Sequence, residues 1–135
     1  GYVKDNAILE NVKKSANYFL NRLPEDLVPY WDFEAEEGDP RDSSAASLAV
    51  CGLLELSQCL GAEGEIYKNA ADAIMESLID HYLNLQYPEQ VGLLLHATQS
   101  LPHHWGVDEF NIWGDYFFVE AIARYTMGKN YKKFW

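Results

Sequence analysis

The chain has 135 residues, of which 48% are hydrophobic, and this is enough apolar material for one domain with a packed core. Its formal net charge of −11 excludes the basic stripe that nucleic acid or an anionic membrane surface would require. We therefore expect neither nucleic acid nor a membrane as a partner, and no apolar run is expected to reach membrane-spanning length.

The first predicted element is an amphipathic helix over about residues 6–22, which Pro24 ends. An acidic loop with several glycine and proline breakers follows over 30–41. A second helix is then expected, with Asp42 or Ser43 as its N-cap and Gly61 closing it after Leu60. This second helix is apolar nearly all round, which predicts burial on all sides.

A third helix is expected over about 63–86, again amphipathic. Its apolar face is predicted to hold Tyr67, Ala70, Ala71, Ile74, Leu78, Ile79 and Tyr82. A long irregular stretch over 89–112 follows, in which 91–95 has the composition of a short strand. The fourth helix is expected to begin near Trp113 or Gly114, to be apolar on most sides and to end at Gly128.

The order of helices is thus amphipathic, apolar, amphipathic, apolar. An ordinary four-helix bundle requires four amphipathic helices, whereas this order suits two layers, with amphipathic helices outside and apolar ones inside. We predict an all-α fold with two outer/inner helix pairs. Two pairs cannot cover both sides of their inner helices, so we expect exposed apolar surface and a homo-oligomer that forms through it.

Two cysteines, Cys51 and Cys59, fall in the second predicted helix. Eight residues of helix separate their Cα atoms by roughly 12 Å, which is beyond disulfide reach. We expect both to be buried free thiols, and reduced thiols are compatible with a cytoplasmic location, which we predict.

The first motif that suits chemistry joins Trp31 and Asp32 to Arg41, Asp42 and Ser43 across the acidic loop. An arginine beside the open N-terminus of a helix favours an anion, because guanidinium and backbone N–H groups both donate to it. The alternative is that Asp42 only caps the helix and Arg41 pairs with Asp32 or Asp42.

The second motif lies in the irregular stretch and contains His96, then His103, His104 and Trp105. A loop of this length in a compact helical chain is usually functional or disordered, and its histidine and tryptophan content argues against disorder. These histidines would hydrogen-bond a sugar or a carboxylate, or satisfy a loop carbonyl. We expect no metal and no cofactor, since the histidines lack the spacing of a known ligand set.

The third motif opens the fourth helix. Asp115 and Glu120 diverge by roughly 140° around a helix, so they would not face the same bond as a catalytic pair. Asp115 suits a cap or a partner of the helix dipole. Tyr116, at the open end of an apolar helix, is the better candidate for contact with a ligand.

Together these motifs resemble the C-terminal third of glycoside hydrolase family 88, the unsaturated glucuronyl hydrolases, with family 105 as a close relative. The resemblance covers about 7–125 and rests on an ordered set of short runs. The runs are Val28-Pro29-Tyr30-Trp31-Asp32-Phe33, Arg41-Asp42-Ser43-Ser44-Ala45-Ala46, Gly52-Leu53-Leu54-Glu55-Leu56, Leu94-Leu95-His96-Ala97-Thr98 and Gly114-Asp115-Tyr116-Phe117.

The resemblance implies that residues 1–135 are the C-terminal fragment of a single (α/α)6 toroid. It also implies an activity, the removal of 4,5-unsaturated uronic acid from lyase-generated oligosaccharides by hydration of the vinyl ether. The family's two essential aspartates lie in the half that this chain does not match, so we assign no catalytic residue and expect the fragment to be inactive. What the resemblance carries over is a wall that binds an unsaturated uronic-acid oligosaccharide: Trp31, Asp32, Arg41, Asp42, Ser43, His96, Trp105 and Tyr116.

The loop sequence Pro102-His103-His104-Trp105 departs from the glucuronyl enzymes, which leaves the identity of the uronide open. Two other readings also stay open. One is a non-catalytic helical module that binds sugars or another protein through an exposed inner face. The other is a piece of a different (α/α)6 enzyme, such as a sugar epimerase.

Overall fold

The computed structural model describes residues 5–132. Four α-helices and three short helical turns make up its regular structure, and this part of the chain contains isolated β-bridges but no strand. The prediction of an all-α fold is confirmed. In chain order the elements are α1 (Asn6–Asn21), α2 (Ser43–Leu60), η1 (Gly61–Gly64), α3 (Glu65–Ser77), η2 (Leu78–Tyr82), α4 (Ile112–Met127) and η3 (Gly128–Asn130).

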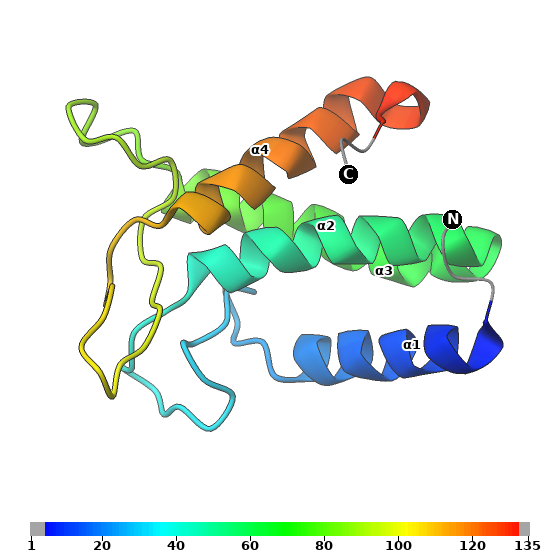
Figure 1. Cartoon of the computed structure of the whole chain (residues 1–135), viewed down its shortest axis with the longest axis horizontal. Coiled ribbons are helices and arrows are strands. Elements are labelled where there is room, and N and C mark those ends of the chain that lie inside the picture. The colour runs from blue at the N-terminus through cyan, green and yellow to red at the C-terminus, as the bar shows by residue number, and fades with distance from the viewer. Residues whose placement is uncertain (1–4, 133–135) are drawn as a thin grey trace.

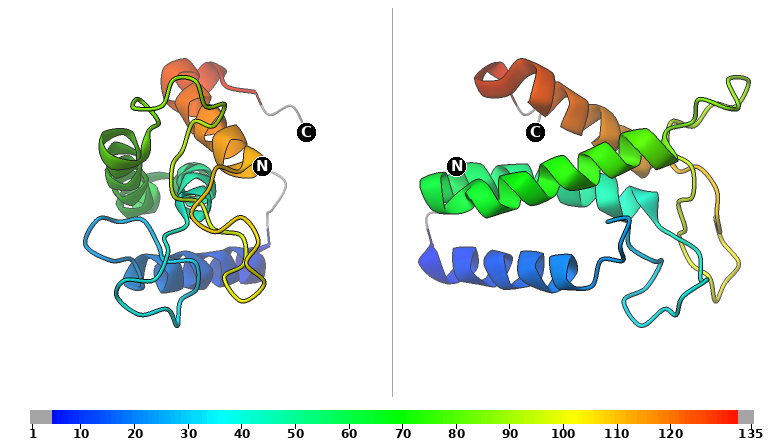
Figure 2. Two further views of the ribbon diagram at one scale, coloured as in Figure 1. Left: turned by 90° about the vertical axis from the view of Figure 1, so that its left-hand side faces the viewer. Right: turned by 180° about the vertical axis from the view of Figure 1, so that it is seen from behind.

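Helix α2 lies at the centre, with α3 and α4 packed against it and α1 along its other side (Figures 1 and 2). The helices α1 and α3 run toward one end of the molecule, whereas α2 and α4 start there and run away from it. The three long loops, 22–42, 83–95 and 96–111, gather at that same end (Figure 1). The N-termini of α2 and α4, which we call the central helices, therefore open into the loops.

The ends of α2 and α4 follow from their capping residues. Asp42 caps α2 by accepting from the backbone N–H of Ser44 at 3.1 Å, and Gly61 ends the helix in a left-handed conformation (φ 61°) that costs a glycine little. Asn111 caps α4, which begins at Ile112, one or two residues earlier than predicted. The predicted boundaries of α2 are confirmed.

The third helix was predicted to reach residue 86, and this is wrong. The helix ends with η2 at Tyr82, because the chain then turns extended and Leu83 forms a bridge with Leu94. Asn84 N donates to Leu93 O at 2.8 Å, and Leu95 N donates to Tyr82 O at the same distance. The short strand predicted over 91–95 is reduced to this bridge, since no second strand lies beside it among the described residues.

The prediction that the apolar helices are buried on all sides is also wrong. One face of each is buried in a common core, but Leu48 of α2 is 50% exposed and Val119 of α4 is 51% exposed. In η2, Ile79 is 45% exposed although we assigned it to the apolar face of the third helix. The expectation that two helix pairs leave apolar surface uncovered is confirmed.

The cysteines differ in their surroundings. Cys51 is buried, with its Sγ 3.3 Å from the carbonyl oxygen of Phe117, whereas Cys59 is exposed, contrary to our prediction. Both are free thiols, so the expectation that they form no disulfide is confirmed.

By length and composition alone, the helical run from Ser43 to Tyr82 is able to cross a membrane, which corrects the expectation that no run reaches that length. The chain reverses direction within this run at η1, so that α2 and α3 pack against each other (Figure 2). Val50 and Leu54 of α2 and Ile74 of α3 belong to the same core. An apolar core helix meets the same criterion as a membrane-spanning one.

Candidate functional site

The N-termini of α2 and α4 are held side by side at the loop end of the molecule. An added Cβ at Gly114 would lie 2.9 Å from the Cβ of Ser44 and 3.2 Å from its Cα, so glycine permits this close approach. Ser47 Oγ donates to the carbonyl oxygen of Gly114 at 3.0 Å and joins the two helices. Two helix N-termini thus point into one region, which favours negative or hydrogen-bond-accepting groups there.

Asp42 is a structural residue at this end. Its Oδ1 accepts from Ser44 N at 3.1 Å, from Ser44 Oγ at 2.6 Å and from Thr98 N at 3.3 Å. The carboxylate caps α2 and also fastens the 96–111 loop to it. The alternative that Asp42 acts as a helix cap is the one the structure supports.

Arg41 is bound from several sides. It donates to Val28 O at 2.9 Å, pairs with Asp26 at 3.2 Å and lies over the ring of Tyr30, 4.0 Å from its centroid. The two predicted partners, Asp32 and Asp42, are not those it uses, so that prediction is wrong. Because Asp26 also accepts from Tyr82 Oη at 2.7 Å, Arg41 ties the 22–42 loop to the end of η2.

Trp31 and Asp32 have different roles. Asp32 is exposed and accepts from Glu34 N at 2.8 Å, which is a local turn and needs no ligand. The Nε1 of Trp31 is buried, and no described residue accepts a hydrogen bond from it. A buried N–H donor of this kind is costly and requires a partner.

Ser43 is fully buried as the first residue of α2. Its backbone N–H donates to the carbonyl oxygen of His96 at 3.1 Å, while its Oγ has no partner among the described residues. At this end of the molecule, two buried polar groups thus have no hydrogen-bond partner among the described residues: the hydroxyl of Ser43 and the indole N–H of Trp31.

His96 lies beside the N-terminus of α2 and has a left-handed backbone conformation (φ 64°). Its Nδ1 lies 2.5 Å from Oδ1 of Asp108, and its ring meets the ring of Tyr82 edge-on, with the centroids 5.8 Å apart. The side chain of His96 is nevertheless 48% exposed. A ligand at the loop end has access to an imidazole whose orientation is already fixed.

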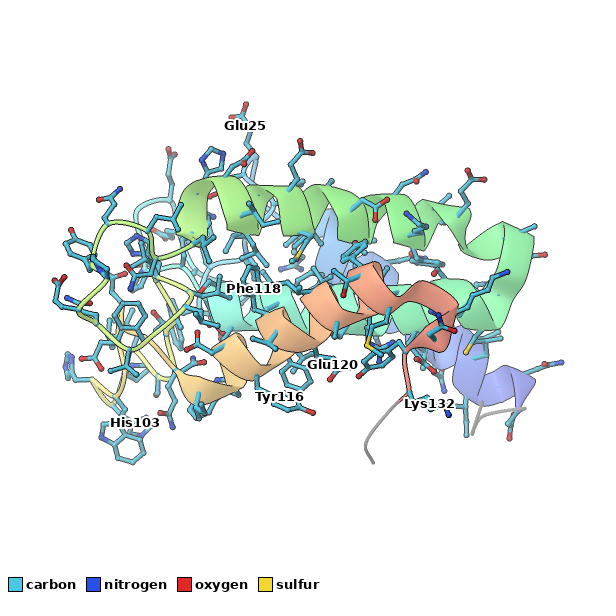
Figure 3. The ribbon with its side chains drawn as sticks, turned by 90° about the horizontal axis from the view of Figure 1, so that it is seen from above. Glu25, His103, Tyr116, Phe118, Glu120 and Lys132 are labelled. Atoms are coloured by element: carbon cyan, nitrogen blue, oxygen red, sulfur yellow. The ribbon has the colours of Figure 1, made fainter. Side chains whose placement is uncertain are left out.

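Trp105 and Tyr116 are the two remaining predicted contacts. Trp105 is 60% exposed, and its ring lies 5.1 Å from that of His103 between centroids. Figure 3 shows His103 at the outer part of the 96–111 loop. Tyr116 is half exposed on α4, on the opposite side of the helix from the buried Phe118 (Figure 3). Exposed aromatic rings of this kind are suitable platforms for sugars.

Comparison with known proteins gives a consistent result. The chain is 43% identical over 99% of its length to the unsaturated chondroitin disaccharide hydrolase of Streptococcus pneumoniae, and 36% identical over 94% to the unsaturated glucuronyl hydrolase of Bacillus sp. GL1. It superimposes on the crystal structure of the Streptococcus agalactiae unsaturated glucuronyl hydrolase with a TM-score of 0.90, at 42% identity over 98% of its length. Over nearly its whole length, the chain is homologous to part of the unsaturated glucuronyl hydrolases.

The match extends over only part of these enzymes. The chain spans 35% of the Streptococcus pneumoniae hydrolase and 36% of the solved Streptococcus agalactiae chain. Unsaturated glucuronyl hydrolases are α/α toroids, so the outer/inner alternation predicted from the sequence corresponds to the architecture of the family. No protein-family model matches the chain.

The acidic residues of α4 have structural partners within the chain. Asp115, in the first turn of α4, accepts from the backbone N–H groups of Leu93 and Leu94 at 3.0 Å. Glu120 is buried and paired with Arg124 at 2.8 Å. The two carboxylates thus have different partners. Within residues 5–132, no three His, Cys, Asp or Glu side chains are grouped to hold a metal ion.

Sequence reasoning missed two residues of the site, Asp26 and Asp108. Each contacts a predicted residue, Arg41 and His96 respectively, across a loop. Neither stands in a motif, and both come within reach only through loop conformations that tertiary packing sets. The backbone bridge between Ala97 and Glu109, which places Asp108 beside His96, has no signal in the sequence.

Proposed function

We propose that the chain is one part of a hydrolase that removes 4,5-unsaturated uronic acid from oligosaccharides produced by polysaccharide lyases. The observation that carries this proposal is the 43% identity, over 99% of the chain, to a protein named for hydrolysis of the unsaturated chondroitin disaccharide. A structural neighbour at 42% identity was crystallised with dGlcA-GalNAc6S, an unsaturated uronic-acid disaccharide.

In this reaction a carboxylic acid protonates the double bond, water adds, and the resulting hemiketal opens. We assign the acid to the part of the enzyme that this chain does not match. The chain's own contribution is to bind and orient the sugar at the loop end. The groups that support this role are the unpaired hydroxyl of Ser43, the unpaired indole N–H of Trp31, the fixed imidazole of His96 and the exposed face of Tyr116.

The other predicted site residues act on this wall indirectly. Arg41 and Asp42 have their hydrogen bonds within the chain, so we propose that they hold the loops in place and leave direct contact to their neighbours. Asp32 shapes a turn. Trp105, at the outer part of the 96–111 loop, is proposed to contact the sugar that follows the uronic acid, which would make this loop a source of specificity.

We further propose that the chain supplies two outer/inner helix pairs, α1–α2 and α3–α4, to an (α/α)6 toroid. A groove of about 570 Å³ between α1 and α2 supports this. Phe19, Leu48 and Trp113 line it, and its walls reach the N-terminus of α2. Helices from the rest of such a toroid would fill this groove and cover the apolar faces.

A chimeric enzyme tests the proposed activity. The matching third of the Streptococcus pneumoniae hydrolase is replaced by residues 5–132, and the product is incubated with unsaturated chondroitin disaccharide while the absorbance of the double bond is followed. We expect turnover, because a binding surface with the same fold would present the sugar to the acid, which the Streptococcus pneumoniae part of the chimera supplies. The chain alone is expected to leave the absorbance unchanged.

A folded but inactive chimera would argue for the alternative of a non-catalytic module, and its circular dichroism and monomer mass establish that it is folded. Clear turnover by the chain alone would overturn the assignment of the acid to the unmatched part. A heparin-derived unsaturated disaccharide serves as the second substrate, since a structural neighbour at 30% identity is an unsaturated glucuronyl hydrolase specific for heparin.

We infer a cytoplasmic location for this activity. Both cysteines are free thiols, and the relatives named above come from bacteria. Fractionation of the source cells, with detection of the chain by an antibody, tests this location, and recovery outside the cytoplasm would contradict it.

A further inference from the structure

Two residues of the 96–111 loop adopt the left-handed conformation while facing each other: His96 (φ 64°) and Asp108 (φ 58°). The bridge that follows them holds them together, because Ala97 N donates to Glu109 O and Glu109 N donates to Ala97 O, both at 2.9 Å. Backbone in this region is unfavourable for side chains other than glycine and is retained mainly where the surroundings require it, often at functional sites.

The imidazole of His96 is held in place from several directions. The carbonyl oxygen of His96 accepts from the first N–H of α2, on Ser43, at 3.1 Å. The ring lies edge-on to Tyr82, whose hydroxyl is itself fixed by Asp26 at 2.7 Å. The position of the ring is thus coupled to α2 and to η2, the two elements that border the loop end.

Asp108 is fixed in a similar way. Its backbone N–H donates to Thr98 Oγ1 at 3.1 Å, and Thr98 N donates to the helix cap Asp42 at 3.3 Å. From this position Oδ1 of Asp108 lies 2.5 Å from Nδ1 of His96. Two residues in an unfavourable backbone conformation and a set of backbone hydrogen bonds therefore place the carboxylate of Asp108 against Nδ1 of His96.

An ionised carboxylate only accepts hydrogen bonds, so the ring nitrogen that faces it carries the hydrogen. In a neutral imidazole the other nitrogen, Nε2, then presents a lone pair. We propose that Asp108 is a positioning residue that holds His96 as its Nδ1–H tautomer, so that Nε2 accepts a hydrogen bond from a hydroxyl group of the sugar. This inference rests on the proposed function for the identity of the ligand, but the tautomer itself does not.

The tautomer is measured on the chain by long-range ¹H–¹⁵N correlation of the histidine rings at about pH 8.5, where an unperturbed imidazole is neutral. We expect His96 to be found as Nδ1–H. The Asp108→Gly variant keeps the left-handed backbone and removes the carboxylate, so we expect the ratio of Nδ1–H to Nε2–H at His96 to fall by about tenfold.

Two controls accompany this measurement. The Glu109→Gln variant removes one negative charge at the neighbouring exposed residue and is expected to leave the tautomer unchanged. His103, whose Nδ1 lies 2.8 Å from Ser100 Oγ, provides an internal reference in the same spectra. Wild-type His96 in the Nε2–H form, or an unchanged ratio in Asp108→Gly, would overturn the proposed positioning.

The role toward sugar is tested in the chimera described above. We expect Asp108→Gly to raise KM for unsaturated chondroitin disaccharide about three- to tenfold with kcat within about twofold, the pattern of a lost binding contact. In a His96→Ala background the same change should raise KM no further, because Asp108 acts through His96. Additive effects, or a drop in kcat alone, would contradict this role. An inactive chimera would remove the sugar role together with the proposed function, and the tautomer result would still decide the positioning.

Discussion

At the scale of single residues, the least expected feature is an ion pair inside the interface of the two central helices. The side chains of Glu120 and Arg124 are only 4% and 6% exposed, and Arg124 also reaches Glu55 at 3.2 Å. The second oxygen of Glu120, Oε2, has no partner among the described residues. Buried charges of this kind stabilise a fold only while they remain paired.

Removing one partner should therefore be costly. We expect Arg124→Met to lower the free energy of unfolding by about 3–5 kcal/mol, because it leaves the carboxylate of Glu120 buried without its cation. The double variant Glu120→Gln/Arg124→Met should recover a large part of that loss. Urea unfolding of the parent, the two single variants and the double variant measures the coupling, and a loss in the double variant equal to the sum of the two single losses would show that the pair is not coupled.

A second prediction at this scale concerns alkaline pH. Burial raises the pKa of the Cys51 thiol from its ordinary value of 9.0 to about 12, and burial also raises the pKa of Tyr82, which donates to Asp26. A group with a raised pKa stabilises the fold fully below its unfolded pKa and loses this contribution as pH rises toward the folded pKa. We expect stability to be lost from about pH 9 upward for Cys51 and from about pH 10 upward for Tyr82, by roughly 1 kcal/mol per pH unit for each group.

Urea midpoints between pH 8 and 11 check this, with Cys51→Ala as the comparison. The variant should be less stable at every pH because a buried side chain is shortened, but its stability should fall less steeply between pH 9 and 10.5. Identical slopes in the two proteins would mean that the thiol stays in the same protonation state in the folded and unfolded chains.

At the scale of elements, two glycines of the central helices test the close approach that forms the site. An added Cβ at Gly114 would come within 3.2 Å of the backbone of Ser44, whereas an added Cβ at Gly52 meets nothing within 4 Å. We expect Gly114→Ala to cost about 1–3 kcal/mol, because α4 must move away from α2. Gly52→Ala should instead stabilise the chain by about 0.5–1 kcal/mol, since alanine favours the helix.

Thermal unfolding of the two variants provides the measurement, and they are matched because both place a methyl group on a central helix. If Gly114→Ala were as stable as the parent, the N-termini of α2 and α4 would not be held at the observed distance.

The elements also show how far local signals reach. The ends of α2 could be predicted because Asp42 and Gly61 satisfy its terminal backbone groups within one turn. The end of the third helix could not, because Leu83 leaves the helix to pair with Leu94, a residue eleven positions further along the chain. The apolar periodicity of the third helix continues beyond Tyr82, although the backbone from Leu83 onward pairs with a segment outside the helix.

At the scale of the whole molecule, uncovered apolar surface is the main physical consequence of two helix pairs standing by themselves. Leu48, Trp113 and Val119 are each more than 40% exposed on the central helices. We expect the chain alone to self-associate through these faces at micromolar concentration, because contiguous apolar surface favours association. Sedimentation velocity over a concentration series measures this.

The Leu48→Glu variant should shift the distribution toward monomer, since it places a charge on that surface. Ile66→Glu is the matched control, because Ile66 is 64% exposed on α3 and lies outside the groove between α1 and α2. A chain that is monomeric throughout, or that responds equally to the two variants, would contradict association through the central helices.

The sequence by itself determined the all-helical class, the alternation of outer and inner helices and the resemblance to the unsaturated glucuronyl hydrolases. These rest on local periodicity, on caps such as Asp42 and on short motifs in order along the chain, all of which are properties of neighbouring residues. The prediction that a site lies at the helix N-termini has the same basis.

Only the tertiary structure decided what the polar residues at that place do. Arg41 pairs with Asp26 and not with its neighbour in sequence, Asp115 binds the loop, and Asp108 fixes His96. Each of these partners is brought in by a loop whose course depends on packing against α2 and η2. The folded loops decide which partner lies within reach of a charged side chain. That partner therefore depends on the whole fold and cannot be predicted from the local sequence.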